Sequence, residues 1–359
     1  MNALFLSISR HTRRNIFWLV TVCVSIVFAA CSNEDNPSPD NSDGKEYTGI
    51  PLIILDTDIG SSTDDLFAMR MLYRYADENQ CVLLGVVVDR QGEDCAALAD
   101  VMNTYFGYPD LPIGVERHGI LSPKVWIDYR PLPTLTSGDK LMFKTSVSDY
   151  SSLPDGWQLY RRLLSEQPDH SVSVCSIGFM SSLAQLLTSG GDSFSPLSGV
   201  ELVRQKVKHL YLMGGVFDND EEPEYNFAQG IEFAATFFRL WPADVPVTFS
   251  PTQVGDLVEY VPEQVISDIS WTDIHPIKQV YMNYNCNTGQ KMWDPMAVIN
   301  AVEGDGLFKF SPWGIVTFHP DATTTFAANP IGRHRYQVPG IQKWSEDMLQ
   351  KIRDYTMIR

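Results

Sequence analysis

Apolar runs of strand length alternate with apolar positions at helical spacing along most of this chain. The run Leu52–Leu55 predicts a buried strand, because strands covered on both faces read as continuous apolar stretches. A helix with one buried face follows, marked by Leu66, Met69, Leu72 and Tyr73. The same alternation continues in strand-like segments at 82–88, 171–177, 209–213 and 245–249 and in helix-like segments at 96–106, 181–187 and 228–240.

This order predicts the α/β class: a single large Rossmann-like domain over 49–359, with a mostly parallel sheet and helices on both faces. The segment 257–290 reads as helical with interruptions at Pro262 and Pro276. Further elements are expected as a helix at 296–301, a strand at 313–318 and a closing helix at 341–355.

The connection 114–152 has many prolines and glycines and no clear period. A loop of that length in a compact domain is usually functional or mobile. It carries Trp126 and Tyr129, which we expect to be available to cover a site.

The first thirty residues predict a targeting signal and not a part of the fold. Arg10, Arg13 and Arg14 precede an apolar run at 16–30, and Cys31 follows it directly. This pattern resembles the lipobox of bacterial lipoproteins. It implies a signal peptide at 1–30, lipidation of Cys31 and a location in the bacterial cell envelope, at the outer membrane or the periplasmic face. The alternative is a single membrane span, for which the run is short against about 30 Å of hydrocarbon.

The composition of the chain limits the kinds of molecule that it is expected to bind. The polar segment 31–48 predicts a flexible tether, so membrane contact is expected only through the lipid anchor. The formal net charge of −17, without a basic stripe, argues against nucleic-acid binding. Cys23 and Cys31 belong to the signal segment. The other four cysteines lack CxxC spacing and are expected to be buried thiols, not disulfides or zinc ligands: Cys81, Cys95, Cys175 and Cys286.

Four carboxylates crowd the turn after the first strand: Asp56, Asp58, Asp64 and Asp65. In open α/β sheets this turn borders the crevice where ligands bind. Carboxylates so close repel one another, and a hard cation such as calcium or magnesium removes the conflict. The alternative is that Asp64 and Asp65 favour a helix N-terminus capped by Thr63, which accounts for two acids and not for four.

Several motifs in order give the chain a likeness to a known family. They are Asp56-Thr57-Asp58-Ile59-Gly60 with Asp64-Asp65, Gly178-Phe179-Met180-Ser181-Ser182, Met213-Gly214-Gly215, Glu224-Tyr225-Asn226 and Asp294-Pro295. Together they resemble the calcium-dependent inosine–uridine preferring nucleoside hydrolases. The resemblance implies hydrolysis of the N-glycosidic bond of ribonucleosides to ribose and free base by a calcium-bound water. It also implies a small-molecule nucleoside as partner and a homo-oligomer.

The resemblance carries residue roles as well. Calcium would be held by Asp58, Asp65, Asp294 and the backbone carbonyl of Ile177. The sugar would be bound by Asp64, Met213, Glu224 and Asn226. Asp58 would also be the general base, because it would touch both the metal and the water.

The residues expected to contact the nucleobase resemble those of the purine-preferring branch of the family. One branch has a histidine acid immediately before the late calcium aspartate, and Trp293 stands there instead. Tryptophans that sandwich the base would then be Trp293 and Trp126, although Trp126 could equally be ordinary packing under the loop. His334 is an alternative acid from the tail, or a surface histidine.

Two departures and two rival functions remain open. The acidic turn is two residues longer than the family pattern, and Asp89 or Asp94 would have to replace an asparagine that binds the sugar. A haloacid-dehalogenase-like phosphatase would use Asp56 as nucleophile with magnesium. A non-catalytic rival is a protein that binds nucleosides or sugars for uptake.

Overall fold

The structure, a computed structural model, describes residues 49–121, 125, 127–219 and 221–357. The expected signal peptide at 1–30, the lipid site Cys31, the tether at 31–48 and the stacking residue Trp126 lie outside the described residues, so they stay predictions. Within the described part of the chain, no helix is long and apolar enough to cross a membrane.

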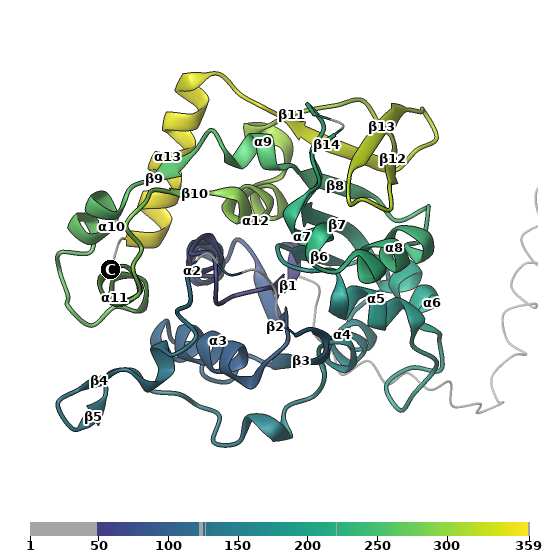
Figure 1. Cartoon of the computed structure of the whole chain (residues 1–359). Coiled ribbons are helices and arrows are strands. Elements are labelled where there is room, and N and C mark those ends of the chain that lie inside the picture. Colours follow the sequence, from purple (N-terminus) through teal and green to yellow (C-terminus); the bar gives the residue numbers. More distant parts are fainter. Residues whose placement is uncertain (1–48, 122–124, 126, 220, 358–359) are drawn as a thin grey trace, which may run out of the picture. The chain divides into compact units, whose positions relative to one another are not determined.

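A ten-stranded sheet organises the domain (Figure 1). Its neighbouring parallel strands are, in spatial order, β3 (Ile113–Ile120), β2 (Val82–Arg90), β1 (Leu52–Thr57), β6 (Val172–Ser176), β7 (Val207–Met213), β8 (Val247–Ser250) and β14 (His334–Val338). Antiparallel strands complete the sheet beyond β14: β12 (Gly314–Phe318), β13 (Thr324–Ala328) and β11 (Lys309–Phe310). Because β1 lies between β2 and β6, the strand order reverses direction there, which is where ligands bind in such sheets.

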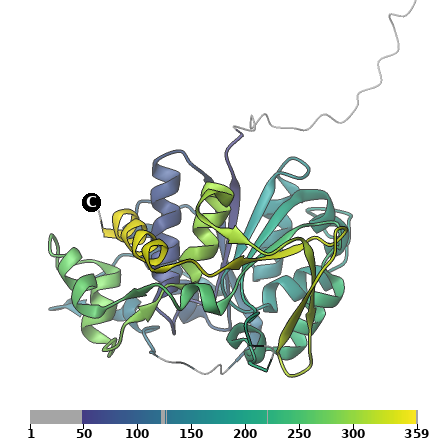
Figure 2. The same ribbon diagram turned by 90° about the horizontal axis from the view of Figure 1, so that it is seen from above.

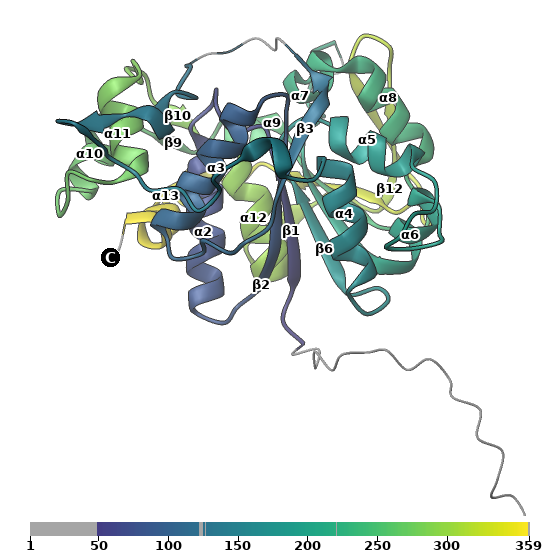
Figure 3. The ribbon, with the colours of Figure 1, turned by 90° about the horizontal axis from the view of Figure 1, so that it is seen from below.

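Helices cover both faces of the sheet (Figures 2 and 3). One layer contains α2 (Asp64–Asp77), α3 (Glu93–Tyr105), α12 (Trp293–Glu303) and α13 (Gln342–Met357). The other contains α4 (Gly156–Ser165), α5 (Ser181–Thr188), α6 (Gly199–Lys206) and α8 (Ile231–Leu240). The predicted fold class is therefore confirmed.

Strand β1 is buried on both faces, as its apolar run predicted. Ile53 and Leu55 belong to the core beneath α2 and α12, whereas Ile54 belongs to the core beneath α4 and α5. This alternation follows from the pleat of a strand, in which successive side chains point to opposite faces. The four cysteines of the domain are buried free thiols, as expected.

Short elements connect these layers. They are α7 (Tyr225–Gln229), α9 (Thr252–Gly255), α10 (Pro262–Asp268), α11 (Pro276–Asn283), the paired strands β9 (Glu259–Tyr260) and β10 (Gln290–Lys291), and the paired strands β4 (Thr136–Ser137) and β5 (Lys140–Leu141). Prolines begin α10 and α11, because the first helical position needs no N–H donor.

Two sequence expectations need correction. The helix expected at 228–240 is broken at Gly230, which ends α7 and precedes α8. The segment 114–152 was expected to lack regular structure, yet its first residues complete β3, and helices α4 and α6 were not anticipated. The periodicity of short elements is too brief to separate from that of loops.

Candidate functional site

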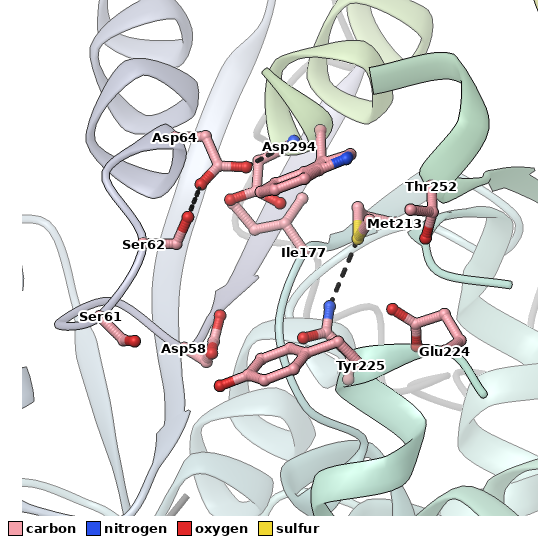
Figure 4. Close-up of a pocket in the computed structure, with 12 residues that line it drawn as sticks. Asp58, Ser61, Ser62, Asp64, Ile177, Met213, Glu224, Tyr225, Thr252 and Asp294 are labelled. Atoms are coloured by element: carbon pink, nitrogen blue, oxygen red, sulfur yellow. Dashed lines mark hydrogen bonds between the residues drawn. The ribbon is translucent and has the colours of Figure 1, made fainter. Parts of the chain in front are cut away.

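A pocket lies at the carboxyl ends of β1, β6 and β7, where the strand order reverses (Figure 4). Loops and helix starts from distant parts of the sequence form its walls. Its lining residues are Asp58, Ser61, Ser62, Asp64, Ile177, Met213, Glu224, Tyr225, Asn226, Thr252, Trp293 and Asp294. Most of the residues expected to bind sugar or metal therefore meet in one cavity.

Three carboxylates converge at one end of this pocket. Asp64 and Asp65 begin α2, Asp294 lies in the first turn of α12, and the two helices pack side by side. One oxygen from each carboxylate lies within 4.8 Å of the other two. The backbone N–H of Asp294 also donates to Asp64 Oδ2 at 3.3 Å across 230 residues of sequence. The helix pairing thus brings the acids together.

The electrostatics of this acid group, Asp64, Asp65 and Asp294, fit a bound cation. Burial raises the pKa of Asp64 to about 6 and raises the pKa values of Asp65 and Asp294 well above the ordinary carboxyl value, and mutual repulsion adds to the effect. Thr57 Oγ1 donates to Asp65 Oδ1, while the buried Oδ2 has no hydrogen-bond partner. Clustered carboxylate oxygens are the donors that Ca²⁺ and Mg²⁺ prefer.

Asp58 lines the pocket beside this group and is ion-paired with a buried arginine. Arg90, at the end of β2, donates from Nη2 to Asp58 Oδ2 at 2.8 Å and from Nε to the Asp58 carbonyl at 2.7 Å. Arg90 is only 1% exposed, and its guanidinium lies 5.0 Å from the ring centre of Phe179. Burial raises the pKa of Asp58, and the charge of Arg90 opposes that rise.

Arg90 was not anticipated as part of the site. The sequence feature that could have indicated it is the charged pair Asp89-Arg90 at the end of an apolar strand. An arginine buried at such a position needs a buried anion as its partner. Nothing in the sequence pattern indicates which acid pairs with Arg90.

The longer acidic turn is held by two outside side chains. Gln290 in β10 donates from Nε2 to Ser62 Oγ at 3.0 Å and to Asp64 Oδ1 at 3.2 Å. Tyr129 donates from its hydroxyl to the Ser62 carbonyl at 2.6 Å and is fully buried. Tyr129 therefore supports the turn and does not cover the pocket. Despite the two extra residues in the turn, Asp64 lies in the acid group with Asp65 and Asp294.

The opposite wall carries the residues expected to bind a sugar (Figure 4). Glu224 caps α7 by accepting from the Phe227 N–H at 2.9 Å, and burial raises its pKa to about 7. Asn226 Nδ2 lies 3.4 Å from Met213 Sδ. The side chains expected to bind hydroxyls thus face the acid group across the cavity.

Ile177, predicted as a metal ligand through its backbone carbonyl, is one of the pocket residues. It follows β6, its N–H donates to the Asp56 carbonyl at 2.8 Å, and it lines the pocket. At the next residue, Gly178, a Cβ atom would lie 2.4 Å from the Asp58 backbone nitrogen. Only glycine permits this approach, which holds the carbonyl end of β6 against the acidic turn.

The remaining candidates divide into pocket and non-pocket residues. Trp293 lines the pocket. Asp94 does not line the pocket. Its Oδ1 accepts from the Cys95 N–H at 3.0 Å in the first turn of α3, and its Oδ2 pairs with Arg130 at 3.6 Å. His334 does not line the pocket either, and its Nδ1 accepts from the Val316 N–H at 3.0 Å within the sheet.

Asp56 and Asp89 form a buried acid pair behind the pocket. Both are 0% exposed, and the Tyr160 hydroxyl donates to Asp56 Oδ2 at 2.7 Å. Burial raises the pKa of Asp56 to about 6 and that of Asp89 well above the ordinary value. Asp56 is thus inaccessible as the nucleophile of a phosphatase, and that rival hypothesis loses its main residue. Asp89 and Asp94 were the two candidates to replace the sugar-binding asparagine of the resembled family. Of these, only Asp89 lies next to the pocket wall, where a Cβ atom at Gly178 would be 2.7 Å from its Oδ1.

The acid group predicts an unusual pH dependence of stability. The folded state keeps protons on carboxyls that the unfolded chain loses above about pH 4, so without metal the free energy of unfolding falls as pH rises through the folded pKa of Asp64, about 6. Calcium binds the ionised form, so it should stabilise the protein more at about pH 8 than at about pH 5. At a hundredfold excess over Kd, this gain should be about 3 kcal/mol. Thermal unfolding with chelator or calcium measures it.

Two variants test this prediction: one removes a charge from the acid group, and the control removes a charge from an exposed turn. Asp294→Asn should raise stability in chelator at about pH 8 and lose most of the calcium response. Asp139→Asn, in the exposed β4–β5 turn, should change neither quantity. A calcium response of wild-type size in Asp294→Asn would contradict the assignment.

The Arg90–Asp58 pair predicts a large loss of stability on charge removal. Arg90→Met leaves a buried carboxylate without its partner and should cost about 3–5 kcal/mol in denaturant unfolding. Arg204→Met breaks the exposed pair with Asp244 and should cost less than about 1 kcal/mol. Equal costs for the two variants would argue against Arg90 as the partner that Asp58 requires.

No protein-family model matches the sequence, and no curated protein is significantly similar to it. Solved structures do share its fold. A plant nucleoside hydrolase, PpNRh1, matches with a TM-score of 0.63 at 13% identity, over 86% of this chain and 99% of that one. A purine-preferring ribonucleoside hydrolase from Gardnerella vaginalis matches with a TM-score of 0.61 at 16% identity, over 86% and 100%. An inosine–uridine preferring nucleoside hydrolase from Bacillus anthracis matches with a TM-score of 0.59 at 17% identity, over 85% and 99%.

The same fold also occurs in effector proteins. The type III effector XopQ, solved with adenosine diphosphate ribose, matches with a TM-score of 0.59 at 14% identity, over 86% of this chain and 95% of that one. Identities this low establish architecture and leave activity to be argued from the site. The described domain has the fold of the inosine–uridine nucleoside hydrolases and carries a buried acid group, Asp64, Asp65 and Asp294.

Proposed function

We propose that this protein hydrolyses the N-glycosidic bond of ribonucleosides to ribose and free base, with a purine preference. One observation carries the proposal: Asp64, Asp65 and Asp294 converge at one end of a pocket whose opposite wall presents Glu224 and Asn226. A cation site therefore faces hydroxyl-binding groups across a cavity, which is what positioning a water against a sugar requires.

Two members of the acid group, Asp65 and Asp294, would hold calcium together with the Ile177 carbonyl and Asp58, which lies outside that group and lines the same pocket. The third member, Asp64, would be left for the sugar. When bound, calcium would hold a water and lower its pKa. Asp58 would accept the proton of that water, since it borders both the acid group and the open cavity. Arg90 orients this carboxylate and favours its ionised form, which is the form a base needs.

The sugar would be bound between two walls. Glu224 and Asn226 would hold hydroxyl groups on one side, Asp64 would hold another on the opposite side, and Met213 would contact the ring. Breaking the C1′–N bond places positive charge on the sugar, as in other glycoside hydrolyses. Fixed carboxylates stabilise that charge as it forms.

The base would stack on Trp293, which lines the pocket. At the same sequence position, one branch of the resembled family has a histidine that acts as an acid. An indole ring provides a face for a purine and no proton donor for its nitrogens, so the proton would come from solvent. The Trp126 side of the predicted sandwich remains part of the proposal.

A second candidate function is binding without turnover. The fold of XopQ, solved with a ribose-containing ligand, favours it, and so does the replacement of the histidine acid by tryptophan. In that role the same pocket would take up a nucleoside and release it unchanged.

Ribose release from inosine, adenosine and uridine tests the hydrolase directly. We expect hydrolysis with calcium, loss of activity with chelator, and a kcat reduced by about 10²–10⁴-fold in Asp58→Asn. Asp94→Asn removes the charge of an aspartate in the first turn of α3, outside the pocket, and should keep wild-type activity. Nucleoside binding with no ribose release under any metal condition would replace the hydrolase with the binding role.

We propose further that the mature protein is anchored in the bacterial cell envelope through Cys31. Full-length protein expressed in a bacterium should then partition with membranes, and Cys31→Ala should prevent lipid attachment. Fractionation and mass spectrometry of the N-terminal peptide provide the readout, and Cys23→Ala is the matched control inside the signal. An unmodified Cys31 on membrane-bound protein would favour a single membrane span instead.

A further inference from the structure

The acidic turn after β1 is two residues longer than in the resembled family, and its length brings serine side chains into the pocket. Ser61 and Ser62, which follow Gly60, both line the cavity. The hydroxyl of Ser62 donates to Asp64 Oδ1 (Figure 4). The longer turn thus supplies a hydrogen bond to the carboxylate that the proposed function assigns to the sugar.

A glutamine from the other end of the domain adds to this support. Gln290 donates from Nε2 to Ser62 Oγ at 3.0 Å and to Asp64 Oδ1 at 3.2 Å. The same nitrogen donates to the Lys291 carbonyl at 2.9 Å, and Oε1 accepts from the Thr63 N–H at 3.3 Å. Because the amide oxygen faces an N–H and the amide nitrogen faces a carbonyl and a carboxylate, these contacts require one orientation of the amide.

Both oxygens of the Asp64 carboxylate therefore have hydrogen-bond donors. Oδ1 accepts from Ser62 and Gln290, and Oδ2 accepts from the Asp294 N–H at 3.3 Å. Asp65, its neighbour in the acid group, has a donor at only one oxygen in the part of the chain that the structure describes. A carboxylate bonded at both oxygens is held in one orientation, which a group that receives a sugar hydroxyl requires.

Gln290 acts on the pocket from outside it. The described lining of the cavity does not include Gln290, whose backbone pairs with Tyr260 between β10 and β9. An effect of Gln290 on a bound ligand therefore passes through the side chains that it contacts, Ser62 and Asp64. The rival explanation is that Gln290 only fastens β10 to the turn, in which case its loss would affect all ligands alike.

We propose that Gln290 is a positioning residue that acts through Asp64 and sets how strongly the pocket prefers a ribose to a sugar that lacks the hydroxyl opposite Asp64. The proposal rests on the proposed function for its ligand and on the hydrogen bonds of the longer turn for its residue. A carboxylate fixed toward a hydroxyl loses its partner when that hydroxyl is missing, and a buried acceptor left unpaired is costly. A carboxylate that is free to turn away loses less.

Three nucleosides that differ by one hydroxyl test the proposal in Gln290→Met, which keeps the length of the side chain and removes its amide. We expect the wild type to favour inosine over 2′-deoxyinosine or 3′-deoxyinosine by at least about 100-fold in kcat/KM. In Gln290→Met the preference over the analogue that lacks the hydroxyl opposite Asp64 should fall at least about fivefold, because kcat/KM falls for inosine and changes little for that analogue. Gln350→Met removes an exposed amide bonded to Asp354 on α13 and should leave both preferences unchanged.

A double-mutant cycle assigns the effect to Asp64. Asp64→Asn identifies the hydroxyl opposite Asp64 as the one whose removal then costs less, and Gln290→Met should change that preference little further in this background. An equal loss of kcat/KM for all three nucleosides in Gln290→Met would show that the glutamine only fastens the turn, and would overturn the proposal. A fall of the same size with and without the Asp64 carboxylate would overturn it as well.

Calcium binding distinguishes a reoriented Asp64 from a displaced acid group. Gln290 makes no hydrogen bond to the side chains proposed as calcium ligands among the described residues, so Gln290→Met should bind calcium within about twofold of the wild-type Kd in calorimetry. A loss of calcium affinity as large as the loss of kcat/KM for inosine would contradict the role given to Gln290.

Binding without turnover keeps this inference separate from the proposed function. If the nucleosides bind and are not hydrolysed, their Kd values with calcium give the same preferences, and the expected fall in Gln290→Met supports the role of Gln290 although the hydrolase is wrong. If inosine is hydrolysed and Gln290→Met leaves both preferences unchanged, the role of Gln290 is wrong and the hydrolase stands. Nucleosides that neither bind nor react would overturn both.

Discussion

Repulsion among buried carboxylates is the constraint around which this site is built. Asp64, Asp65 and Asp294 place oxygens within 4.8 Å of one another in a pocket where burial already raises their pKa values. A folded protein can relieve such repulsion by protonation, by an arginine or by a metal ion. The raised pKa values of Asp56 and Asp89 correspond to the first of these, and Arg90 at Asp58 to the second. The acid group is the place that a metal ion would fit.

The architecture provides the rigidity that this arrangement needs. Adjacent parallel strands β1 and β6 end beside one another, and helices α2 and α12 pack together above them. Their packing determines where three acids from both ends of the domain meet. Tyr129 and Gln290 then brace the acidic turn from outside, so that the inserted residues do not displace Asp64. Side chains positioned by strands and helices are held more accurately than side chains on free loops.

The two ends of the pocket carry different chemical groups. The acid group and Asp58 lie where a cation and a water would be needed, and Glu224 and Asn226 lie where hydroxyls would be bound. Trp293 offers a ring face backed by Asp256 instead of a histidine proton donor.

The sequence by itself determined the class of fold, the buried thiols and the identity of the acids, because apolar periodicity and clustered carboxylates are local features. It also gave the residues that line the pocket at Met213, Glu224, Asn226 and Trp293, through motifs in a recognisable order. Only the tertiary structure decided that Arg90 pairs with Asp58, that Gln290 holds the longer turn, and that Asp56 and Asp94 are outside the pocket. These contacts join residues far apart in the chain, and no local pattern specifies which buried charge finds which partner until the strands and helices have packed.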